Sequence, residues 1–214
     1  CDLLAARSAK SFPVDININK SIPSPGGLGG VSSNLTNIII GLNDLWGINL
    51  SQSEFKQIAS QFGNDAIFFV DPHISQISGK GEIITKLENK ISANLVIIPM
   101  LNINVPTNKT KTMYSKSNSQ DMTSGQQVNN FINNSDNATL DEDNIFNAFE
   151  GIIKREYPEH YFANQLIEQY IQKKVHLSGS GPTVYCLADN KKEAEQITDT
   201  LQARQIKAFI AQII

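Results

Sequence analysis

The sequence has few cysteines, no long apolar run and no excess of basic charge. Its two cysteines, Cys1 and Cys186, give no disulfide framework, which favours a reducing compartment. Apolar runs such as residues 38–40 and 95–99 are far shorter than the roughly 20 residues of a membrane-spanning helix. A net charge of −3, from 18 Lys and Arg against 21 Asp and Glu, argues against non-specific binding to nucleic acid. We expect a cytoplasmic monomer or homodimer without membrane or nucleic-acid partners.

The 214 residues are 40% hydrophobic, which is enough for the core of one or two domains. No signal peptide is visible, and the chain begins with Cys1 and helical-looking sequence. We therefore expect a fragment that lacks its N-terminal part. A targeting segment, for example of plastid type, would have been lost with that part.

The most informative stretch is residues 23–45, which starts with a glycine-rich loop. The first glycine loop (residues 26–30) holds four glycines, and Ser32 and Ser33 follow it. An apolar period of 3.6 residues then predicts a helix from Ser33 to about Trp46 that ends at Gly47. A glycine loop before a helix suits an anion such as phosphate, because unpartnered amides and the helix dipole favour negative charge. The alternative is a simple flexible turn.

Two familiar phosphate motifs do not match this loop. The Walker pattern requires Lys and then Ser or Thr after its last glycine, whereas Val31 and Ser32 follow Gly30. The dinucleotide pattern requires a glycine where this chain has Ser32. A third kind of nucleotide-phosphate loop is therefore favoured.

Asp65 is the candidate carboxylate. Ser51 and Glu54 form a capping-box pattern, which predicts a helix that Gly63 closes. Its predicted apolar face consists of Phe55, Ile58, Ala59 and Phe62. Asp65 would then lie in a turn ahead of a buried strand over residues 66–70. An ordinary turn residue is the alternative interpretation.

The other elements are predicted from periodicity and turn residues. We expect a helix end over residues 3–12, a half-buried strand over 14–19 and a glycine hairpin over 74–84. Residues 115–137 are polar, so we expect a mobile loop or insertion that adds little stability. From residue 93 onward the predicted order is a split β-α-β, ferredoxin-like arrangement with one extra helix. Its elements are strand 93–100, helices starting at 139 and 162, strands 175–177 and 183–188, helix 191–204 and strand 207–214.

The first glycine loop resembles the ATP motif of the GHMP kinase superfamily, most closely that of the 4-diphosphocytidyl-2-C-methyl-D-erythritol kinase family. Ile22-Pro23, a GLGG core and two serines before Asn34 match this family, although Val31 replaces a glycine. The resemblance implies that ATP and Mg²⁺ are bound here, the metal ion through Ser32 or Ser33. The implied ATP-binding residues are Pro23, Gly26, Gly27, Leu28, Gly29, Gly30, Val31, Ser32, Ser33 and Asn34.

Three further segments resemble motifs of the same family. The segment GNDAIFF at residues 63–69 resembles the one that carries the catalytic carboxylate, which implies this role for Asp65. Residues 105–107 (VPT) resemble a substrate-binding segment, which implies a substrate contact for Thr107. The segment LSGSGPTVY resembles the third motif, which lies near the ATP loop. Its loop residues are Ser178, Gly179, Ser180 and Gly181.

The resemblance implies an α+β, two-domain GHMP kinase fold. We expect residues 1–89 to belong to an incomplete N-terminal ribosomal-protein-S5-like domain and residues 90–214 to a C-terminal ferredoxin-like domain. The implied reaction transfers the ATP γ-phosphoryl group to a hydroxyl of 4-diphosphocytidyl-2-C-methyl-D-erythritol. The family pairs its catalytic Asp with a lysine in an upstream motif that these 214 residues do not contain, so we expect the fragment alone to be inactive. The alternatives are another GHMP kinase, acting on homoserine or a mevalonate derivative, and a non-catalytic nucleotide-binding relic.

The three histidines, His73, His160 and His176, have no metal-ligand spacing. We interpret them as structural or surface residues.

Overall fold

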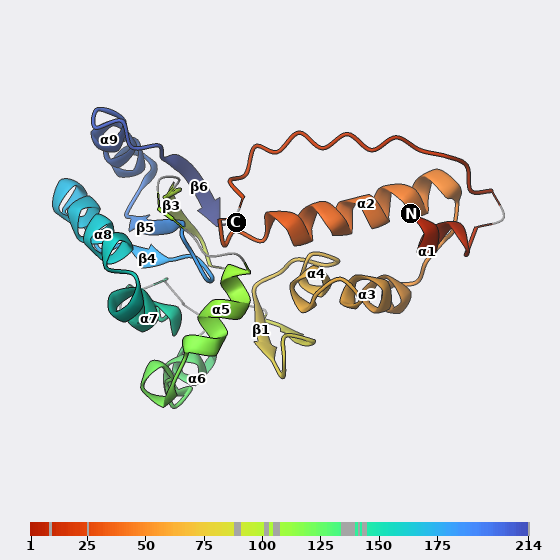
Figure 1. Cartoon of the computed structure of the whole chain (residues 1–214), viewed down its shortest axis with the longest axis horizontal. Coiled ribbons are helices and arrows are strands. Elements are labelled where there is room, and N and C mark those ends of the chain that lie inside the picture. The colour runs from red at the N-terminus through yellow and green to blue at the C-terminus, as the bar shows by residue number, and fades with distance from the viewer. Residues whose placement is uncertain are drawn as a thin grey trace. The chain divides into compact units, whose positions relative to one another are not determined.

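The computed structural model describes residues 1–8, 10–24, 26–87, 91–100, 103–104, 108–133, 140, 142 and 145–213, with residues 127, 131 and 133 described by their backbone only. The chain divides into two compact units. Unit 1 comprises Cys1–Ser24 and Gly29–Glu88, and unit 2 comprises Pro25–Leu28 and Asn89–Ile214. Figure 1 shows the helices and strands of both, and each unit is described by itself.

Unit 1 is mainly helical. It contains the helices α1 (Asp2–Ala5), α2 (Gly30–Trp46), α3 (Gln52–Ser60) and α4 (Asn64–Phe68), and the antiparallel hairpin β1 (Ser75–Ser78) and β2 (Ile83–Lys86). The predicted capping box is confirmed: Ser51 Oγ accepts from the Glu54 amide, and Glu54 Oε2 accepts from the Ser51 amide. Gly47 ends α2 in a left-handed conformation, as predicted. The core cluster consists of Leu4, Ile39, Leu42, Trp46, Ile58, Ala59 and Ala66.

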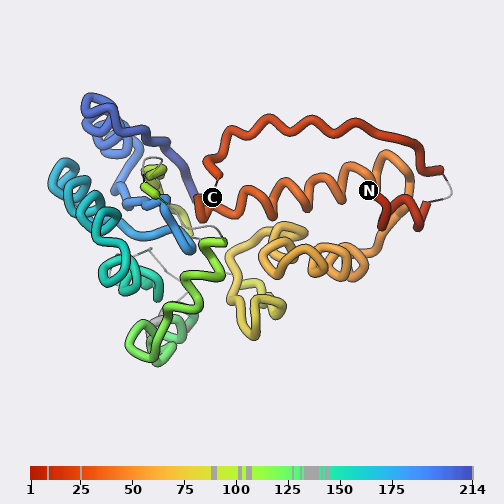
Figure 2. The backbone as a smooth tube through the Cα atoms, in the orientation of Figure 1, coloured from red at the N-terminus to blue at the C-terminus, as the bar shows by residue number. Residues whose placement is uncertain are grey.

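The predicted strand over residues 14–19 is wrong. Residues 11–20 are neither helix nor strand, although their backbone runs as a long open stretch (Figure 2). Ile16 and Ile18 are each 45% exposed. A strand requires a neighbour for its amide and carbonyl groups, and the described part of unit 1 pairs none with this segment. The predicted helix over 3–12 is also too long, since α1 ends at Ala5.

The apolar residues after Asp65 form a helix, which corrects the predicted strand over residues 66–70. Asp65 lies in the first turn of α4, and Ala66 and Ile67 are buried. A short apolar run has the same composition in a buried strand and in a buried helix. Gly63 therefore precedes α4 and does not cap α3, whose C-cap is Gln61, and Phe62 is 57% exposed.

Unit 2 contains an antiparallel four-stranded sheet in the order β4-β5-β3-β6. The strands are β3 (Ala93–Ile98), β4 (His176–Leu177), β5 (Val184–Ala188) and β6 (Phe209–Ile213). Between them come α7 (Phe149–Glu156), α8 (Pro158–Ile171) and α9 (Lys191–Gln202). This order confirms the ferredoxin-like arrangement with one extra helix, and Figure 1 shows α8 and α9 on one side of the sheet.

The core of unit 2 lies between that side of the sheet and the helices. Val96, Val184 and Cys186 are fully buried on the strands and pack in one cluster with Ile197 and Leu201 of α9. Side chains of this size each contribute about 1.5–3 kcal/mol when buried. This cluster fixes the strand ends from which the second glycine loop (residues 178–182) projects.

The polar insertion is more ordered than predicted. Residues 115–133 include the end of α5 (Lys109–Lys116), a 3₁₀ turn η1 (Ser119–Asp121) and α6 (Gln126–Asn133). Asp121 is only 5% exposed and binds Arg155 of α7 through two hydrogen bonds of 2.6 and 2.9 Å. The expectation of a mobile loop is therefore wrong for this part. Residues 134–139 lie outside the described residues, and so does the predicted helix start at Thr139.

The helix that was expected to start at residue 139 begins at Phe149. The Asn147 side chain accepts a hydrogen bond from the Phe149 amide at 3.0 Å. Such a side-chain acceptor satisfies a donor that a helix start leaves free.

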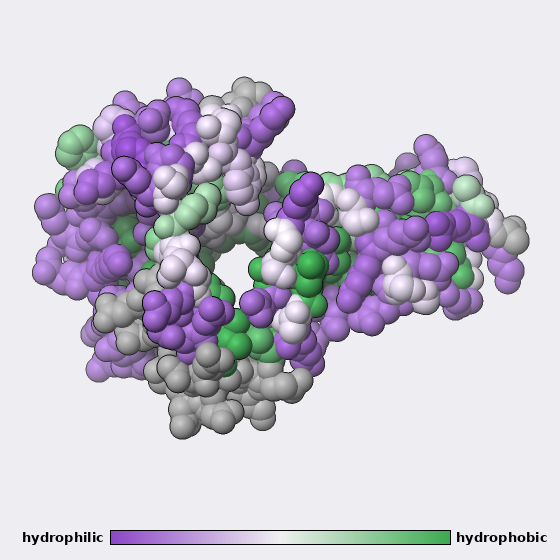
Figure 3. All heavy atoms as spheres, turned by 90° about the horizontal axis from the view of Figure 1, so that it is seen from below, coloured by the Kyte–Doolittle hydropathy of each residue, from purple (hydrophilic) through white to green (hydrophobic). Residues whose placement is uncertain are grey.

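The exposed surface is mostly hydrophilic on the face shown in Figure 3, and hydrophobic side chains appear there in small separate groups. Among the helices that the structure describes, none is long and apolar enough to cross a membrane.

Candidate functional site

In unit 1, the end of the first glycine loop is the start of a long helix. α2 begins at Gly30, three residues earlier than predicted, so Val31, Ser32 and Ser33 occupy its first turn. Gly29 is the N-cap in a left-handed conformation with φ of 66°. No side chain caps this end, and the first turn holds no acidic residue. The first amides of α2 are therefore available to an anion, which the dipole of a 17-residue helix also favours.

Gly29 is also required for space. A Cβ atom at this position would lie 2.7 Å from Cζ of Phe69. Because Phe69 follows α4 directly, this contact places the end of α4 against the start of α2. Ile22 packs against the last glycine of this loop, since its Cγ2 would lie 3.3 Å from a Cβ at Gly30.

A buried hydrogen bond between Thr36 of α2 and Ala66, the residue after Asp65, fixes the position of Asp65 next to α2. Thr36 Oγ1 donates to the Ala66 carbonyl at 3.0 Å, and Thr36 is fully buried. Thr36 lies three and four positions after Ser33 and Ser32, so the three side chains share one stretch of the helix surface. Asp65 itself is exposed in the first turn of α4. Unit 1 thus places an exposed carboxylate on a short helix fixed to α2.

In unit 2, residues 26–28 of the first glycine loop pack against the second glycine loop. Ser178 Oγ donates to the Gly27 carbonyl at 3.0 Å, across 151 positions of sequence. A Cβ atom at Gly27 would collide with the Ser178 carbonyl oxygen, and one at Gly179 would lie 3.0 Å from the Gly27 carbonyl oxygen. These are backbone atoms, which cannot move aside. The two loops therefore need glycine at both positions.

Side chains that the sequence reasoning missed hold the second glycine loop. Asn147 Nδ2 donates to the carbonyls of Leu177 and Gly179 at 2.8 Å each. Glu150 Oε1 accepts from the Leu177 amide at 3.0 Å, and burial raises the pKa of this carboxyl. The N-x-x-E spacing of Asn147 and Glu150 resembles a helix cap, and nothing in it indicates the loop 30 residues later.

The hydroxyl of Ser180 forms a hydrogen bond with a residue of α5. Ser180 Oγ lies 3.1 Å from Thr110 Oγ1, and Ser180 is buried. Thr110 belongs to α5, which follows the predicted substrate segment, while Thr107 itself lies outside the described residues.

Two histidines of unit 2 are buried. His160 is 2% exposed and His176 is fully buried, and burial lowers the pKa of each to about 4. His73 of unit 1 lies 3.1 Å from the Asp71 carboxylate. Within the described residues, no three His, Cys, Asp or Glu side chains could hold a metal ion together.

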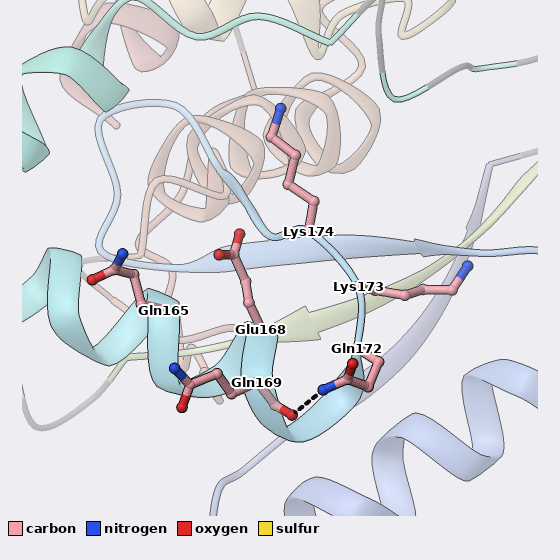
Figure 4. A pocket seen from close by; sticks show the side chains of 6 residues that line it. All are labelled: Gln165, Glu168, Gln169, Gln172, Lys173 and Lys174. Atoms are coloured by element: carbon pink, nitrogen blue, oxygen red, sulfur yellow. Dashed lines mark hydrogen bonds between the residues drawn. The ribbon is translucent and has the colours of Figure 1, made fainter.

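A wide hollow at the end of α8 is unrelated to either loop. Figure 4 shows its lining: Gln165, Glu168, Gln169, Gln172, Lys173 and Lys174. Several of these groups serve the local turn. Glu168 accepts from the Val175 amide at 3.0 Å, and Lys173 pairs with Asp189 and Glu193, each at 3.2 Å. Gln172 donates to the carbonyl of Gln169 (Figure 4). We therefore interpret the residues that line this hollow as structural residues and not as a binding site.

Comparison with known families identifies the chain. The family described as GHMP kinases N terminal domain matches residues 2–74, and GHMP kinases C terminal matches residues 130–207. The chain belongs to the GHMP kinase family. This GHMP kinase is 28% identical over 210 residues to a 4-diphosphocytidyl-2-C-methyl-D-erythritol kinase of Dehalococcoides mccartyi, covering 98% of the chain and 73% of that relative. It is 31% identical to one of Prochlorococcus marinus, covering 91% of the chain and 66% of that relative.

Solved structures agree on the fold of this GHMP kinase. A 4-(cytidine 5′-diphospho)-2C-methyl-D-erythritol kinase superposes with a TM-score of 0.72 at 22% identity, covering 91% of this chain and 68% of the other. A homoserine kinase from Cytophaga hutchinsonii gives 0.67 at 14% identity, with the same coverage.

Proposed function

We propose that this GHMP kinase phosphorylates 4-diphosphocytidyl-2-C-methyl-D-erythritol with ATP, a step of the non-mevalonate isoprenoid pathway. The observation that carries this proposal is the pair of named relatives that align along 91–98% of the chain. We further propose a cytoplasmic location and a boundary between the N- and C-terminal GHMP kinase domains at residues 89 and 90. We expect a monomer or homodimer.

The first glycine loop and α2 would bind the ATP phosphates. Free amides of the first turn and close backbone approach at Gly29 and Gly30 support this role. Phosphoryl transfer requires mainly positioning and charge stabilisation, and both come here from fixed backbone groups. The contact of Gly27 with Ser178 would keep residues 26–28 in the conformation that the phosphates need.

Mg²⁺ fits the oxygen groups at this helix start, because it prefers oxygen ligands and phosphates to a dedicated protein cage. The half-buried hydroxyl oxygens of Ser32 and Ser33 are suitable ligands for this ion. Bound Mg²⁺ would neutralise charge on the phosphate oxygens.

Asp65 would act on the acceptor hydroxyl of the substrate. Its carboxylate accepts the hydroxyl proton as the oxygen forms its bond to the γ-phosphorus, and the bond to the ADP oxygen breaks. The exposure of Asp65 leaves it accessible to a substrate, and Thr36 keeps α4 in place.

A substrate panel tests the proposal. ADP release is measured with 4-diphosphocytidyl-2-C-methyl-D-erythritol, homoserine and mevalonate in parallel, using the naturally expressed protein. We expect turnover with the first compound only. Turnover with homoserine alone would support a homoserine kinase instead. We include homoserine because a homoserine kinase has a similar fold. ATP binding without turnover on any compound would support a non-catalytic nucleotide-binding protein.

A further inference from the structure

Beside the second glycine loop lies a small cavity with two buried polar atoms that have no hydrogen-bond partner among the described residues. It is lined by Ile103, Asn104, Lys109, Met113, Ile153, Tyr157, His160, Ser180 and Pro182. Its volume is about 10 Å³, room for roughly one oxygen-sized group. Lys109 is 9% exposed and His160 is 2% exposed. Among the described residues, neither Lys109 Nζ nor His160 Nε2 has a hydrogen-bond partner.

A buried ammonium without a counter-ion is costly, so its presence needs a reason. Burial alone lowers the pKa of Lys109 to about 8, which leaves it mostly charged at pH 7. The charge of Lys109 in turn helps to lower the pKa of His160, after the larger effect of burial. The Lys109 ammonium would gain from a negatively charged oxygen in the cavity.

The surroundings of the cavity favour a phosphoryl oxygen as that group. The cavity shares Ser180 with the second glycine loop, and Ser180 Oγ bonds to Thr110 of the same helix as Lys109. The ring of His160 also contacts this loop, since its Cε1 would lie 3.4 Å from a Cβ at Gly181. The ammonium ion of Lys109 and the hydroxyl of Ser180 line the cavity at a glycine loop and are suitable donors to a phosphate oxygen when Thr110 donates to Ser180.

We infer that Lys109 and Ser180 bind a phosphoryl oxygen of one of the two nucleotide substrates at the second glycine loop. The assignment of this oxygen to a nucleotide rests on the proposed function, whereas the presence of an anion site does not. Both candidate sources, the triphosphate of ATP and the diphosphate of a cytidine compound, offer the same chemistry.

The test compares Lys109→Met, which keeps length and volume but removes the charge, with Lys192→Met on exposed α9 as a matched control. Calorimetry measures the affinities of pyrophosphate, ATP and CDP for the naturally expressed protein and its variants. We expect Lys109→Met to weaken pyrophosphate binding about 10- to 100-fold, the usual effect of one charge-assisted contact, and Lys192→Met to leave it unchanged. Ser180→Ala should weaken it by a smaller factor.

The ATP and CDP arms identify the source. A loss for ATP only assigns the oxygen to the triphosphate, a loss for CDP only assigns it to the diphosphate, and a loss for both assigns the site to both. If ATP and CDP do not bind the naturally expressed protein, the proposed function fails, while the pyrophosphate arm still decides on the anion site.

Thermal unfolding without ligand separates binding from structure. Removing an unpaired buried charge should raise the melting temperature of Lys109→Met. Three results would overturn the inference: absent pyrophosphate binding by the unmodified chain, unchanged pyrophosphate affinity in Lys109→Met, or a lower melting temperature of that variant. The last two would mean that Lys109 is a structural residue whose cavity holds water.

Discussion

Asp121 binds Arg155 through both carboxylate oxygens, at 2.6 and 2.9 Å, and this pair joins the polar insertion to α7. Asp121 also lies close to the backbone of α7, since a Cβ atom at Gly151 would lie 2.6 Å from Asp121 Oδ1. Arg155 lies one turn after Gly151 on the helix whose start holds Asn147 and Glu150, the two residues that bond the second glycine loop. The insertion is therefore part of the support of that loop.

Asp121→Asn should lower the melting temperature by a few degrees. Hydrogen bonding to Arg155 lowers the pKa of Asp121, with a further contribution from the Asn118 amide. A lowered pKa of an acid means stability that is present above the unfolded-state value and is lost as pH falls through the folded-state value. The variant should therefore differ most from the unmodified chain at neutral pH and least in strong acid. Asp189→Asn is the control and should change little, because the Asp189 side chain is 80% exposed in its pair with Lys173.

Gly29→Ala should weaken ATP binding because the new Cβ would collide with Phe69. Gly47→Ala is the matched control: it has a similar positive φ but no atom within 4 Å of its Cβ position. Both substitutions carry the backbone strain of about 1–2 kcal/mol, so a difference in ATP affinity measures the local contact. Adding Phe69→Leu to Gly29→Ala should restore part of the affinity. Equal ATP affinities of Gly29→Ala and Gly47→Ala would indicate that the first glycine loop is a simple turn and does not bind ATP.

Asn147→Asp should disturb the second glycine loop, since a carboxylate cannot donate to the carbonyls of Leu177 and Gly179. Leaving two carbonyls unpaired beside a negative charge should destabilise unit 2 by about 1–3 kcal/mol. We also expect a higher KM for ATP. Asn43→Asp provides a control, because its Oδ1 accepts from the Leu50 amide and an aspartate retains that acceptor. If urea unfolding shows the same stability for both variants, the Asn147 bonds are unimportant.

His176→Phe should stabilise the chain, and more so in weak acid. His176 is fully buried, neither of its ring nitrogens has a hydrogen-bond partner among the described residues, and its ring lies 5.6 Å from that of Tyr185. Its pKa of about 4 lies below the unfolded value near 6.5. The unfolded chain therefore takes up a proton first, and stability falls as pH drops from about 6.5 to 4. The shift corresponds to about 3 kcal/mol.

Phenylalanine at position 176 keeps the ring packing and cannot be protonated. The melting temperature of His176→Phe should therefore match or exceed that of the unmodified chain at pH 7, and the difference should grow at pH 5. A difference that shrinks toward pH 5 would contradict this account.

In the naturally expressed protein, Asp65→Asn should reduce kcat about 100- to 10,000-fold, the usual effect of losing a positioned acid–base group. The melting temperature should stay the same, because Asp65 is exposed and α4 is held by Thr36 and Ala66. Asp71→Asn, also exposed in unit 1, is the control for a general charge effect. Equal rates of ADP release for Asp65→Asn and the unmodified protein would return Asp65 to an ordinary helix-start residue.

Local patterns in the sequence by itself determined much of this protein. The Ser51–Glu54 capping box, the end of α2 at Gly47 and the strand at Ala93–Ile98 depend on neighbours within a few positions, so propensity and periodicity are sufficient to predict them. The order of elements from residue 93 likewise indicated the ferredoxin-like sheet. The glycine and serine motifs by themselves indicate the GHMP kinase family.

Only the tertiary structure decided the rest, because the deciding contacts join residues that are far apart in the sequence. The run after Asp65 is helical where Thr36 bonds Ala66 thirty positions away, and the stretch of 11–20 lacks a paired strand in the described part of unit 1. The burial of Asp121 depends on Arg155, 34 positions later. The closeness of Gly27 to Ser178 and the burial of Lys109 are likewise products of packing. A periodic pattern records which residues can be buried, whereas the chain's fold determines what they are buried against.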